Sequence, residues 1–273
     1  MGNGDHDGFH LLYLFKGAII GVANIIPGVS GGTLAVVLGI YDKLIGAIGN
    51  FLTDSNNRRS YTIFLAQIGL GALLAIFLLS NIMDFLYENH KIPTLYFFIG
   101  LIIGSIPTVM KQHTDMRLNA PNSLFFIIGF IAVLSLELLN VSEANGGGSD
   151  YNIALFFVAG IASAAAMIVP GFSGSFVLVA MGVYWDLIDA VKAFDIVALI
   201  PPAIGGLIGI IGISKLINNI IKNHPSKFYY FIMGLIIASI FVLFPGLPSD
   251  KEILAASMAT CVFGMLISLK LSK

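Results

Sequence analysis

Ten long apolar runs divide the chain and constrain its fold more than any other feature. Each is between about 18 and 26 residues long, close to the roughly 20 residues that an α-helix needs to cross a bilayer. Strands of membrane barrels are shorter and alternate in polarity, so the runs predict an all-α polytopic membrane protein. Their approximate bounds are 9–26, 30–50, 61–86, 93–110, 121–140, 152–169, 173–193, 196–221, 228–245 and 252–270.

Composition supports this class and excludes several others. Hydrophobic residues make up 57% of the chain, against about 45–50% in soluble domains, and the mean hydropathy is +0.93. The net charge of −1 and the lack of a basic tract predict no nucleic-acid partner. No cluster has metal-ligand spacing and no Gly-Lys-Ser/Thr loop occurs, so we expect no metal, no cofactor and no ATP-driven pump. The single Cys261 cannot form an internal disulfide.

Two short polar motifs with a Pro-Gly pair interrupt these runs, at residues 24–33 and 169–175. Small hydroxyl residues and glycines follow each pair, where the next helix begins. Hydroxyls and backbone N–H groups at a helix start can bind an anion, and glycine lets the anion approach closely. We therefore expect one anion site built from both copies, although tight turns at a membrane surface and hydroxyls that cap their own helices remain alternatives. The candidate residues are Asn24, Gly28, Ser30, Gly31, Gly32, Thr33, Gly171, Ser173, Gly174 and Ser175.

The sequence also repeats itself. A shift of 143 residues places Pro27-Gly28 on Pro170-Gly171 and Tyr41 on Tyr184, and a shift of 134 places Asn89-His90 on Asn223-His224. We therefore predict a single transmembrane domain, residues 1–273, made of two homologous halves. The first half is about 9–140, the linker is 141–150 with a flexible Gly-rich composition, and the second half is about 151–270.

Parity and charge predict the orientation of the halves. Each half has five apolar segments, and an odd number inverts the second half relative to the first. Lys and Arg gather at alternate ends, which by the positive-inside rule places both chain termini in the cytoplasm. The segments that flank each motif are either full spans or re-entrant hairpins, and the polar tips favour hairpins. The basic residues of the predicted cytoplasmic side are Arg58, Arg59, Lys111, Arg117, Lys222, Lys227, Lys270 and Lys273.

Four charged residues are further candidates. Lys16 lies inside the first apolar run, where it either contacts the substrate or extends to the membrane surface. Arg58 and Arg59 form a basic pair that either attracts anionic lipid heads or only fixes topology. Glu137, near the end of its run, is either a proton relay or an interfacial carboxylate.

Two weaker patterns concern packing. Gly17-Gly21, Gly100-Gly104 and Gly205-Gly209 have the small-xxx-small spacing of closely packed helices. Tyr41, Tyr184 and Trp185 follow the two motifs, and we interpret them as aromatic anchors at the membrane interface.

The motif Asn24-x-x-Pro27-Gly28-x-Ser30-Gly31-Gly32-Thr33, its Pro170-Gly171-x-Ser173-Gly174 partner and the repeated halves resemble the bacterial polyprenyl-phosphate translocases. The resemblance covers essentially the whole chain. It implies a multi-pass protein of the cytoplasmic membrane that returns undecaprenyl phosphate, the lipid carrier of cell-wall precursors, from the outer to the inner leaflet.

The motif also resembles, more distantly, the Pro-Gly-x-Ser-Arg-Ser signature of the undecaprenyl-pyrophosphate phosphatases. Gly31 and Gly174 stand where that family has arginine, and Gly32 replaces the following serine. An arginine fork would hold a pyrophosphate and stabilise its transition state, so we expect a transporter and not an enzyme. The paired glutamates of such a phosphatase are also missing, since the glutamates of the chain are Glu88, Glu137, Glu143 and Glu252.

Rival functions remain open at this stage. A secondary carrier of small organic or inorganic anions would use the same motif, a lipid pyrophosphate phosphatase would release phosphate, and a scaffold of cell-wall assembly would not transport at all. The expected partners are a polyprenyl-phosphate lipid and the bilayer. A homodimer and coupling to a proton or sodium ion are both compatible with the sequence.

Overall fold

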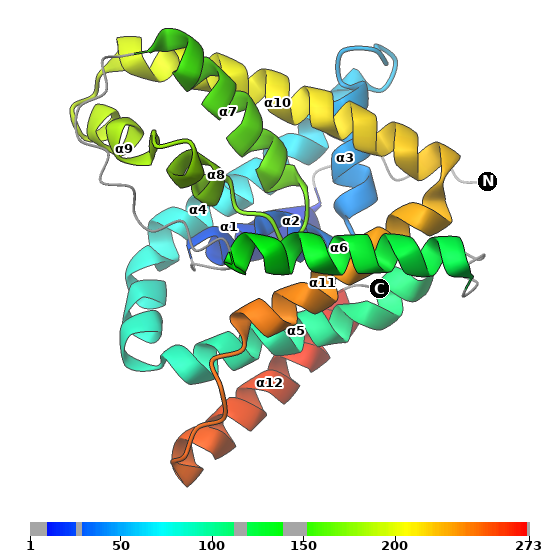
Figure 1. The fold of residues 1–273 in the computed structure, drawn as a ribbon, viewed down its shortest axis with the longest axis vertical. Coiled ribbons are helices and arrows are strands. Elements are labelled where there is room, and N and C mark those ends of the chain that lie inside the picture. The colour runs from blue at the N-terminus through cyan, green and yellow to red at the C-terminus, as the bar shows by residue number, and fades with distance from the viewer. Residues whose placement is uncertain (1–9, 26–28, 112–118, 139–151, 272–273) are drawn as a thin grey trace.

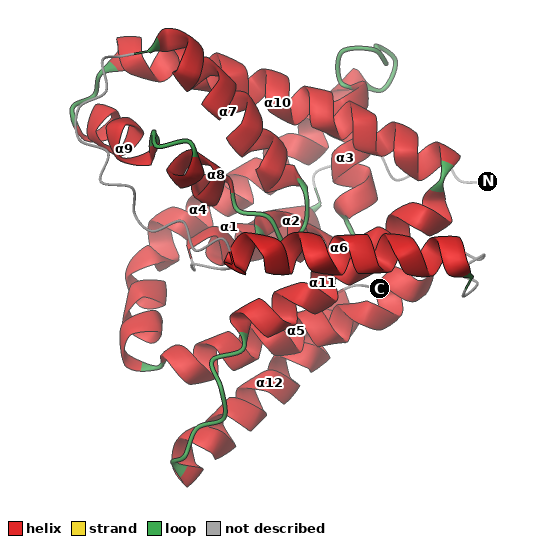
Figure 2. Ribbon diagram, in the orientation of Figure 1, coloured by secondary structure: helices red, strands yellow, loops and turns green. Residues whose placement is uncertain are grey.

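The protein is described by a computed structural model that covers residues 10–25, 29–111, 119–138 and 152–271. These residues form helices joined by short loops, without strands (Figure 2). All ten predicted runs contain helices, which confirms the all-α class. The helices are α1 (Leu11–Ile25), α2 (Gly31–Val37), α3 (Tyr41–Asn50), α4 (Arg58–Asn89), α5 (Lys91–Lys111), α6 (Ala120–Leu138), α7 (Ile153–Ile168), α8 (Gly174–Ala180), α9 (Tyr184–Lys192), α10 (Ile196–Asn223), α11 (Pro225–Leu243) and α12 (Lys251–Leu271).

Several helices are suited to a membrane. Among the described residues, α4, α5, α10, α11 and α12 are long and apolar enough to cross one, and the count rises to 7 if the bent pairs α2–α3 and α8–α9 each form one span. Large apolar side chains such as Phe77 on α4 and Val197 on α10 are about four-fifths exposed. Such side chains suit contact with lipid, so this is a multi-pass membrane protein.

Glycine faces hold the long helices together. An added Cβ on Gly17 would lie 2.2 Å from the Ile68 carbonyl oxygen, and one on Gly205 would lie 2.1 Å from that of Phe157. The helix pairs α1–α4 and α7–α10 therefore pack backbone to backbone. Gly100, at 2.0 Å from the Cys261 carbonyl oxygen, does the same for α5 and α12. The expectation that the small-xxx-small spacings mark close packing is confirmed.

Two helices from the first stretch of the chain pack against two helices from the second stretch. Helix α5 packs along α12, and α6 packs along α11, in the lower part of Figure 1. Helices α1–α4 and α7–α10, in contrast, pair within their own stretch of the chain. Every one of these pairs has a counterpart at the equivalent place in the other stretch. The pairs α5–α12 and α6–α11 therefore join helices from the first and the second stretch of the chain.

Two expected apolar segments are broken. The segments 30–50 and 173–193 were each predicted as one helix, but each contains a sharp turn, which bends α2–α3 by 119° and α8–α9 by 111°. Gly39 and Gly182 have φ values of +66° and +73° at these turns. This left-handed backbone favours glycine and ends the helix. The prediction that each of these two segments forms one continuous helix is therefore wrong.

The two bent pairs differ in their surroundings. Most of α2 is buried near the middle of the molecule, whereas Gly174 is the buried residue of α8, and α8–α9 lie toward the upper left of Figure 1. Helix α3 packs against α10 at Gly49, and Asn218 Nδ2 donates to Asn50 Oδ1 at 3.2 Å. In the part of the chain that the structure describes, α9 has no comparable packing against α4. The structure is thus asymmetric between two similar stretches of sequence.

Candidate functional site

The first motif lies where α1 ends and α2 begins. Gly28 lies outside the described residues, together with Pro27. An added Cβ on Gly31 would lie 2.8 Å from Asn24 Oδ1, so the Asn24 amide packs across this glycine. The Asn24 side chain is itself exposed. Glycine at position 31 therefore leaves room for a polar side chain that reaches the surface of the tip.

The second motif follows α7. Helix α7 ends at Ile168 because Val169 precedes Pro170 and takes an extended conformation. Gly171 has a φ of +80°, and a Cβ there would lie 2.9 Å from Val133 Cγ2 and 3.0 Å from Ser239 Oγ. Both the backbone conformation and the lack of space therefore require glycine at position 171.

The two motifs touch one another. The Gly171 N–H donates to Thr33 Oγ1 at 2.8 Å, and Thr33 is 1% exposed. An added Cβ on Gly32 would lie 3.0 Å from the Ile168 carbonyl oxygen, so the backbones of the two tips meet at this glycine. Tyr41 Oη donates to the same Ile168 oxygen at 3.2 Å. Motifs about 140 residues apart in sequence thus form one contact.

The serines at the helix starts do not cap their helices. Ser30 and Ser173 occupy the N-cap positions of α2 and α8, yet neither side chain accepts a hydrogen bond from its helix. Ser30 Oγ is buried and has no hydrogen-bond partner among the described residues, which is costly for a hydroxyl group. Ser173 Oγ lies 2.8 Å from Ser175 Oγ in an exposed position. The capping alternative is therefore wrong for Ser30 and Ser173, and the role of both hydroxyls in binding stays a prediction.

Gly174, the first residue of α8, packs against α7. Its carbonyl oxygen accepts a hydrogen bond from Ser163 Oγ at 3.0 Å, and a Cβ there would lie 2.6 Å from Met167 Cγ. This contact ties the start of α8 to α7. Gly174 therefore acts in packing, with its Cα surrounded by α7 side chains.

Lys16 is buried, and its side chain contacts the C-terminal end of α2. Its Nζ donates to the Leu38 carbonyl oxygen at 2.7 Å, and the residue is 6% exposed. Leu38 is the C-cap residue of α2. Backbone carbonyl groups at this end of a helix lack hydrogen-bond partners within the helix. The ammonium group satisfies one of them and does not extend to the molecular surface.

The other charged candidates lie elsewhere. Arg58 and Arg59 are exposed at the start of α4, and Arg58 donates to the carbonyl oxygens of Phe51 and Leu52 at 3.2 and 3.4 Å. Glu137 belongs to α6, but its side chain lies outside the described part of the chain. The structure therefore does not bring Arg58 and Arg59 to the contact between the motifs, and the Glu137 prediction stays untested.

The residues that follow the first motif are more buried than the sequence suggested. Tyr41 is 4% exposed and stacks on Phe228, so its interpretation as an interface anchor is wrong, whereas Trp185 is 43% exposed. Asp42 accepts a hydrogen bond from Tyr229 of α11. Sequence analysis missed these contacts because they join helices far apart in the chain. The one available signal is a Tyr-Asp-Lys run inside an apolar region.

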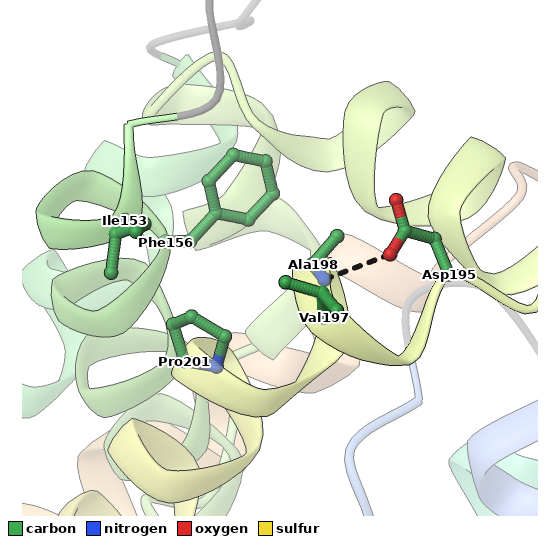
Figure 3. Close-up of a pocket in the computed structure, with 6 residues that line it drawn as sticks. All are labelled: Ile153, Phe156, Asp195, Val197, Ala198 and Pro201. Atoms are coloured by element: carbon green, nitrogen blue, oxygen red, sulfur yellow. Dashed lines mark hydrogen bonds between the residues drawn. The ribbon is translucent and has the colours of Figure 1, made fainter.

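The structure holds two notable cavities. One, of about 230 Å³, lies where α7 and α10 begin and is lined by Ile153, Phe156, Asp195, Val197, Ala198 and Pro201. Figure 3 shows that Asp195 Oδ1 accepts the Ala198 N–H, at 3.1 Å, which caps α10. With a carboxylate and no cationic side chain in its lining, this cavity does not suit an anion. The other, of about 330 Å³, lies between α3 and α4 and includes Lys43.

Comparisons with known proteins agree with the motif. A family model described as "VCA0040-like: Undecaprenyl phosphate translocase-like" matches residues 20–262. The chain is 33% identical over 279 residues to a "Polyprenyl-phosphate transporter" of Staphylococcus aureus, with 97% of each chain covered. It is 28% identical over 247 residues to a "Polyprenyl-phosphate transporter" of Vibrio cholerae, covering 86% of this chain and 78% of that one. No solved structure matches. The chain therefore belongs to the undecaprenyl phosphate translocase-like family.

Proposed function

We propose that this protein transports polyprenyl phosphate across the membrane and binds the monophosphate head where its two motifs meet. The observation that carries this proposal is the contact between Thr33 and Gly171, with the unpartnered hydroxyl of Ser30 three residues away in sequence. A phosphate oxygen would accept the hydrogen bond that Ser30 otherwise lacks. Membership of the family and the names of two relatives support the lipid substrate.

The remaining candidate residues have distinct roles in this proposal. Ser173 and Ser175 add hydroxyl donors from the second hairpin, and Asn24 adds an amide from the first. Gly32 and Gly171 let the backbones of the two motifs approach one another, Gly174 lets α8 pack on α7, and Gly28 and Gly31 let the head approach the first motif. Lys16 is a positioning residue, since it holds the end of α2 through Leu38.

The proposed topology is that of two inverted halves with re-entrant hairpins. The first hairpin is approached from the cytoplasm and the second from outside, with both termini and the Arg58-Arg59 pair on the cytoplasmic side of the inner membrane. The helix order and the equivalent pairs α1–α4 and α7–α10 support this arrangement. The head then moves from the outer to the inner leaflet, which returns the carrier lipid for reuse in envelope synthesis.

The asymmetry between the bent pairs supplies a mechanism. In this conformation α3 is fixed on α10 and α9 is not fixed on α4. Inverted halves can exchange conformations, so the opposite state has α9 on α4 and α3 released. The head would stay bound to hydroxyls and amides throughout, because a bare phosphate in hydrocarbon is prohibitively unfavourable. The polyprenyl tail stays in lipid.

Binding to purified protein tests the substrate and the site together. Wild type and a Ser30→Ala/Ser173→Ala double variant are titrated with undecaprenyl phosphate, with undecaprenyl pyrophosphate, inorganic phosphate and a neutral polyprenol as competitors. We expect selective binding of the lipid monophosphate, with a component at the motifs that the double variant loses. Equal binding of monophosphate and neutral polyprenol would contradict the proposal, and phosphate release from the pyrophosphate would favour a phosphatase.

A further inference from the structure

The pocket between α3 and α4 has the lining of an anion site. Its volume is about 330 Å³, and a buried water needs roughly 10–15 Å³, so a phosphate group fits together with several waters. Its lining mixes one cation with amides, hydroxyls and small residues. The lining residues are Lys43, Gly46, Ala47, Asn50, Asn57, Ser60, Tyr61 and Phe64.

Lys43 is the cation of this pocket. Its Nζ donates to Tyr13 Oη at 2.8 Å and lies 4.3 Å from the centre of the Tyr13 ring and 4.8 Å from that of Phe64. In the described part of the chain no carboxylate forms an ion pair with Lys43. An ammonium group has three N–H donors, and Tyr13 takes one of them. The others can bind an anion in the pocket.

The neighbouring acidic residues do not neutralise this lysine. Asp42 adjoins it in sequence but accepts a hydrogen bond from Tyr229 on α11, away from α4. Asp54, in the loop before α4, accepts hydrogen bonds from Asn57 Nδ2 at 2.8 Å and from Tyr61 Oη at 3.0 Å. These bonds, that of Asn57 first, lower the pKa of the Asp54 carboxyl, so an ionised carboxylate uses the side-chain donors of two lining residues and leaves Lys43 as the group that would bind an anion. Arg58 and Arg59 add positive charge at the same end of α4.

The pocket lies along α3, whose first residue contacts the second motif and whose end adjoins the loop before α4. Helix α3 begins at Tyr41, whose hydroxyl is bonded to Ile168 at the second motif. It ends at Asn50, about 13 Å further along at 1.5 Å per residue. Lys43 stands near the first end of this path, and Asn57 stands beside Arg58 and Arg59 at the second.

We propose that the Lys43 pocket is a second binding site for the phosphomonoester head, occupied after the head leaves the two motifs and before it reaches the cytoplasmic leaflet. This inference rests on the proposed function. The motifs supply hydroxyl donors without a charge, whereas Lys43 supplies a charge-assisted hydrogen bond, which is stronger. The head thus passes from a neutral site to a cationic one on its way to Arg58 and Arg59.

Binding of undecaprenyl phosphate to purified full-length variants tests this site. Lys43→Met removes the charge and keeps the side-chain length. Gly46→Leu adds a bulky apolar side chain at a lining position and leaves the charge, and its Cβ, the first atom added, meets only Asn218 Oδ1, at 3.9 Å. Lys192→Met is the matched control, since Lys192 is an exposed lysine on α9 that pairs with Asp189. Inorganic phosphate serves as the soluble competitor in each case.

We expect wild type to bind the lipid at two sites per chain, one at the motifs and one in the pocket. Lys43→Met and Gly46→Leu should each weaken binding at one of these two sites by about tenfold or more, the usual effect of losing a hydrogen bond to a charged group, while Lys192→Met binds as wild type. Wild-type binding by both pocket variants would overturn the inference and leave the proposed function standing. A loss in Lys43→Met alone would overturn it too, because the charge would then act outside the pocket. Absence of lipid binding in wild type would instead reject the proposed function. Displacement by inorganic phosphate at equal concentration would keep the pocket as a phosphate site and contradict the lipid substrate.

Discussion

Gly171 N–H donates a hydrogen bond to Thr33 Oγ1 across a separation of 138 residues. This bond joins the two Pro-Gly motifs. Thr33 is buried, so water cannot replace the bond. It is therefore both a structural link and a marker of the place where the two Pro-Gly motifs meet.

Thr33→Val removes this bond and leaves the Gly171 N–H without a partner. We expect a loss of about 1 to 3 kcal/mol of stability, the cost of an unsatisfied buried donor, together with reduced transport. Thr33→Ser keeps the hydroxyl and restores both. Thermal unfolding in detergent and transport in vesicles check the prediction, and wild-type stability of Thr33→Val would show that the bond is unimportant.

Gly32→Ala separates the two tips. The added Cβ would lie 3.0 and 3.1 Å from the carbonyl oxygens of Ile168 and Met167, which are backbone atoms that cannot move cheaply. We expect overpacking to cost about 1–3 kcal/mol and to abolish most transport. Gly69→Ala on α4 is the control, because nothing lies within 4 Å of its added Cβ. Equal transport by the two alanine variants would argue against contact between the tips.

Lys16→Met separates positioning from substrate binding. The substitution leaves the Leu38 carbonyl oxygen without its buried partner, so we expect a lower melting temperature and slower transport. Because Lys16 holds α2 and does not touch the head in our proposal, the affinity for lipid monophosphate in the remaining folded protein should change little. A loss of affinity without loss of stability would instead make Lys16 a substrate ligand.

A disulfide between α3 and α10 tests the proposed exchange of conformations. Asn50→Cys with Asn218→Cys, in a Cys261→Ala background, replaces the hydrogen bond between these side chains. We expect oxidation to fix this conformation and stop transport, and reduction to restore it. Full transport by the oxidised pair would show that α3 and α10 need not separate.

A disulfide between α9 and α4 would test the opposite conformation. The 143- and 134-residue shifts relate Gly49 to Lys192 and Lys215 to Asn81. Both Lys192 and Asn81 are exposed in this structure. A Lys192→Cys/Asn81→Cys pair should therefore cross-link only during transport, when α9 reaches α4. No cross-link under any transport condition would count against the exchange.

The sequence predicts the helices well because membrane spans depend on local properties. Each of the ten apolar runs became a helix or a bent pair, and the glycine spacings marked the close packing, as at Gly100 against α12. The turns at Gly39 and Gly182 were missed, although Gly-Ile-Tyr and Gly-Val-Tyr recur there at the 143-residue shift. An isolated glycine in an apolar run is compatible with a continuous helix, so the signal was ambiguous.

The site was predictable only in part. The two motifs were expected to meet, and the Thr33–Gly171 bond places them in contact, but their role in binding stays a prediction. The Lys43 pocket depends on how α3, α4 and α1 pack, which no local pattern encodes. The asymmetry between α2–α3 and α8–α9 was equally hidden, because similar sequences can occupy different conformations.

Leaflet exchange in reconstituted vesicles tests the central claim most directly. Undecaprenyl phosphate is placed in both leaflets, and an impermeant phosphatase is added outside. With wild type we expect all of the lipid to be hydrolysed, because the inner pool reaches the outer leaflet, whereas the Ser30→Ala/Ser173→Ala variant should expose only the outer pool, as in protein-free vesicles. Hydrolysis limited to the outer pool with correctly folded wild type would contradict the account.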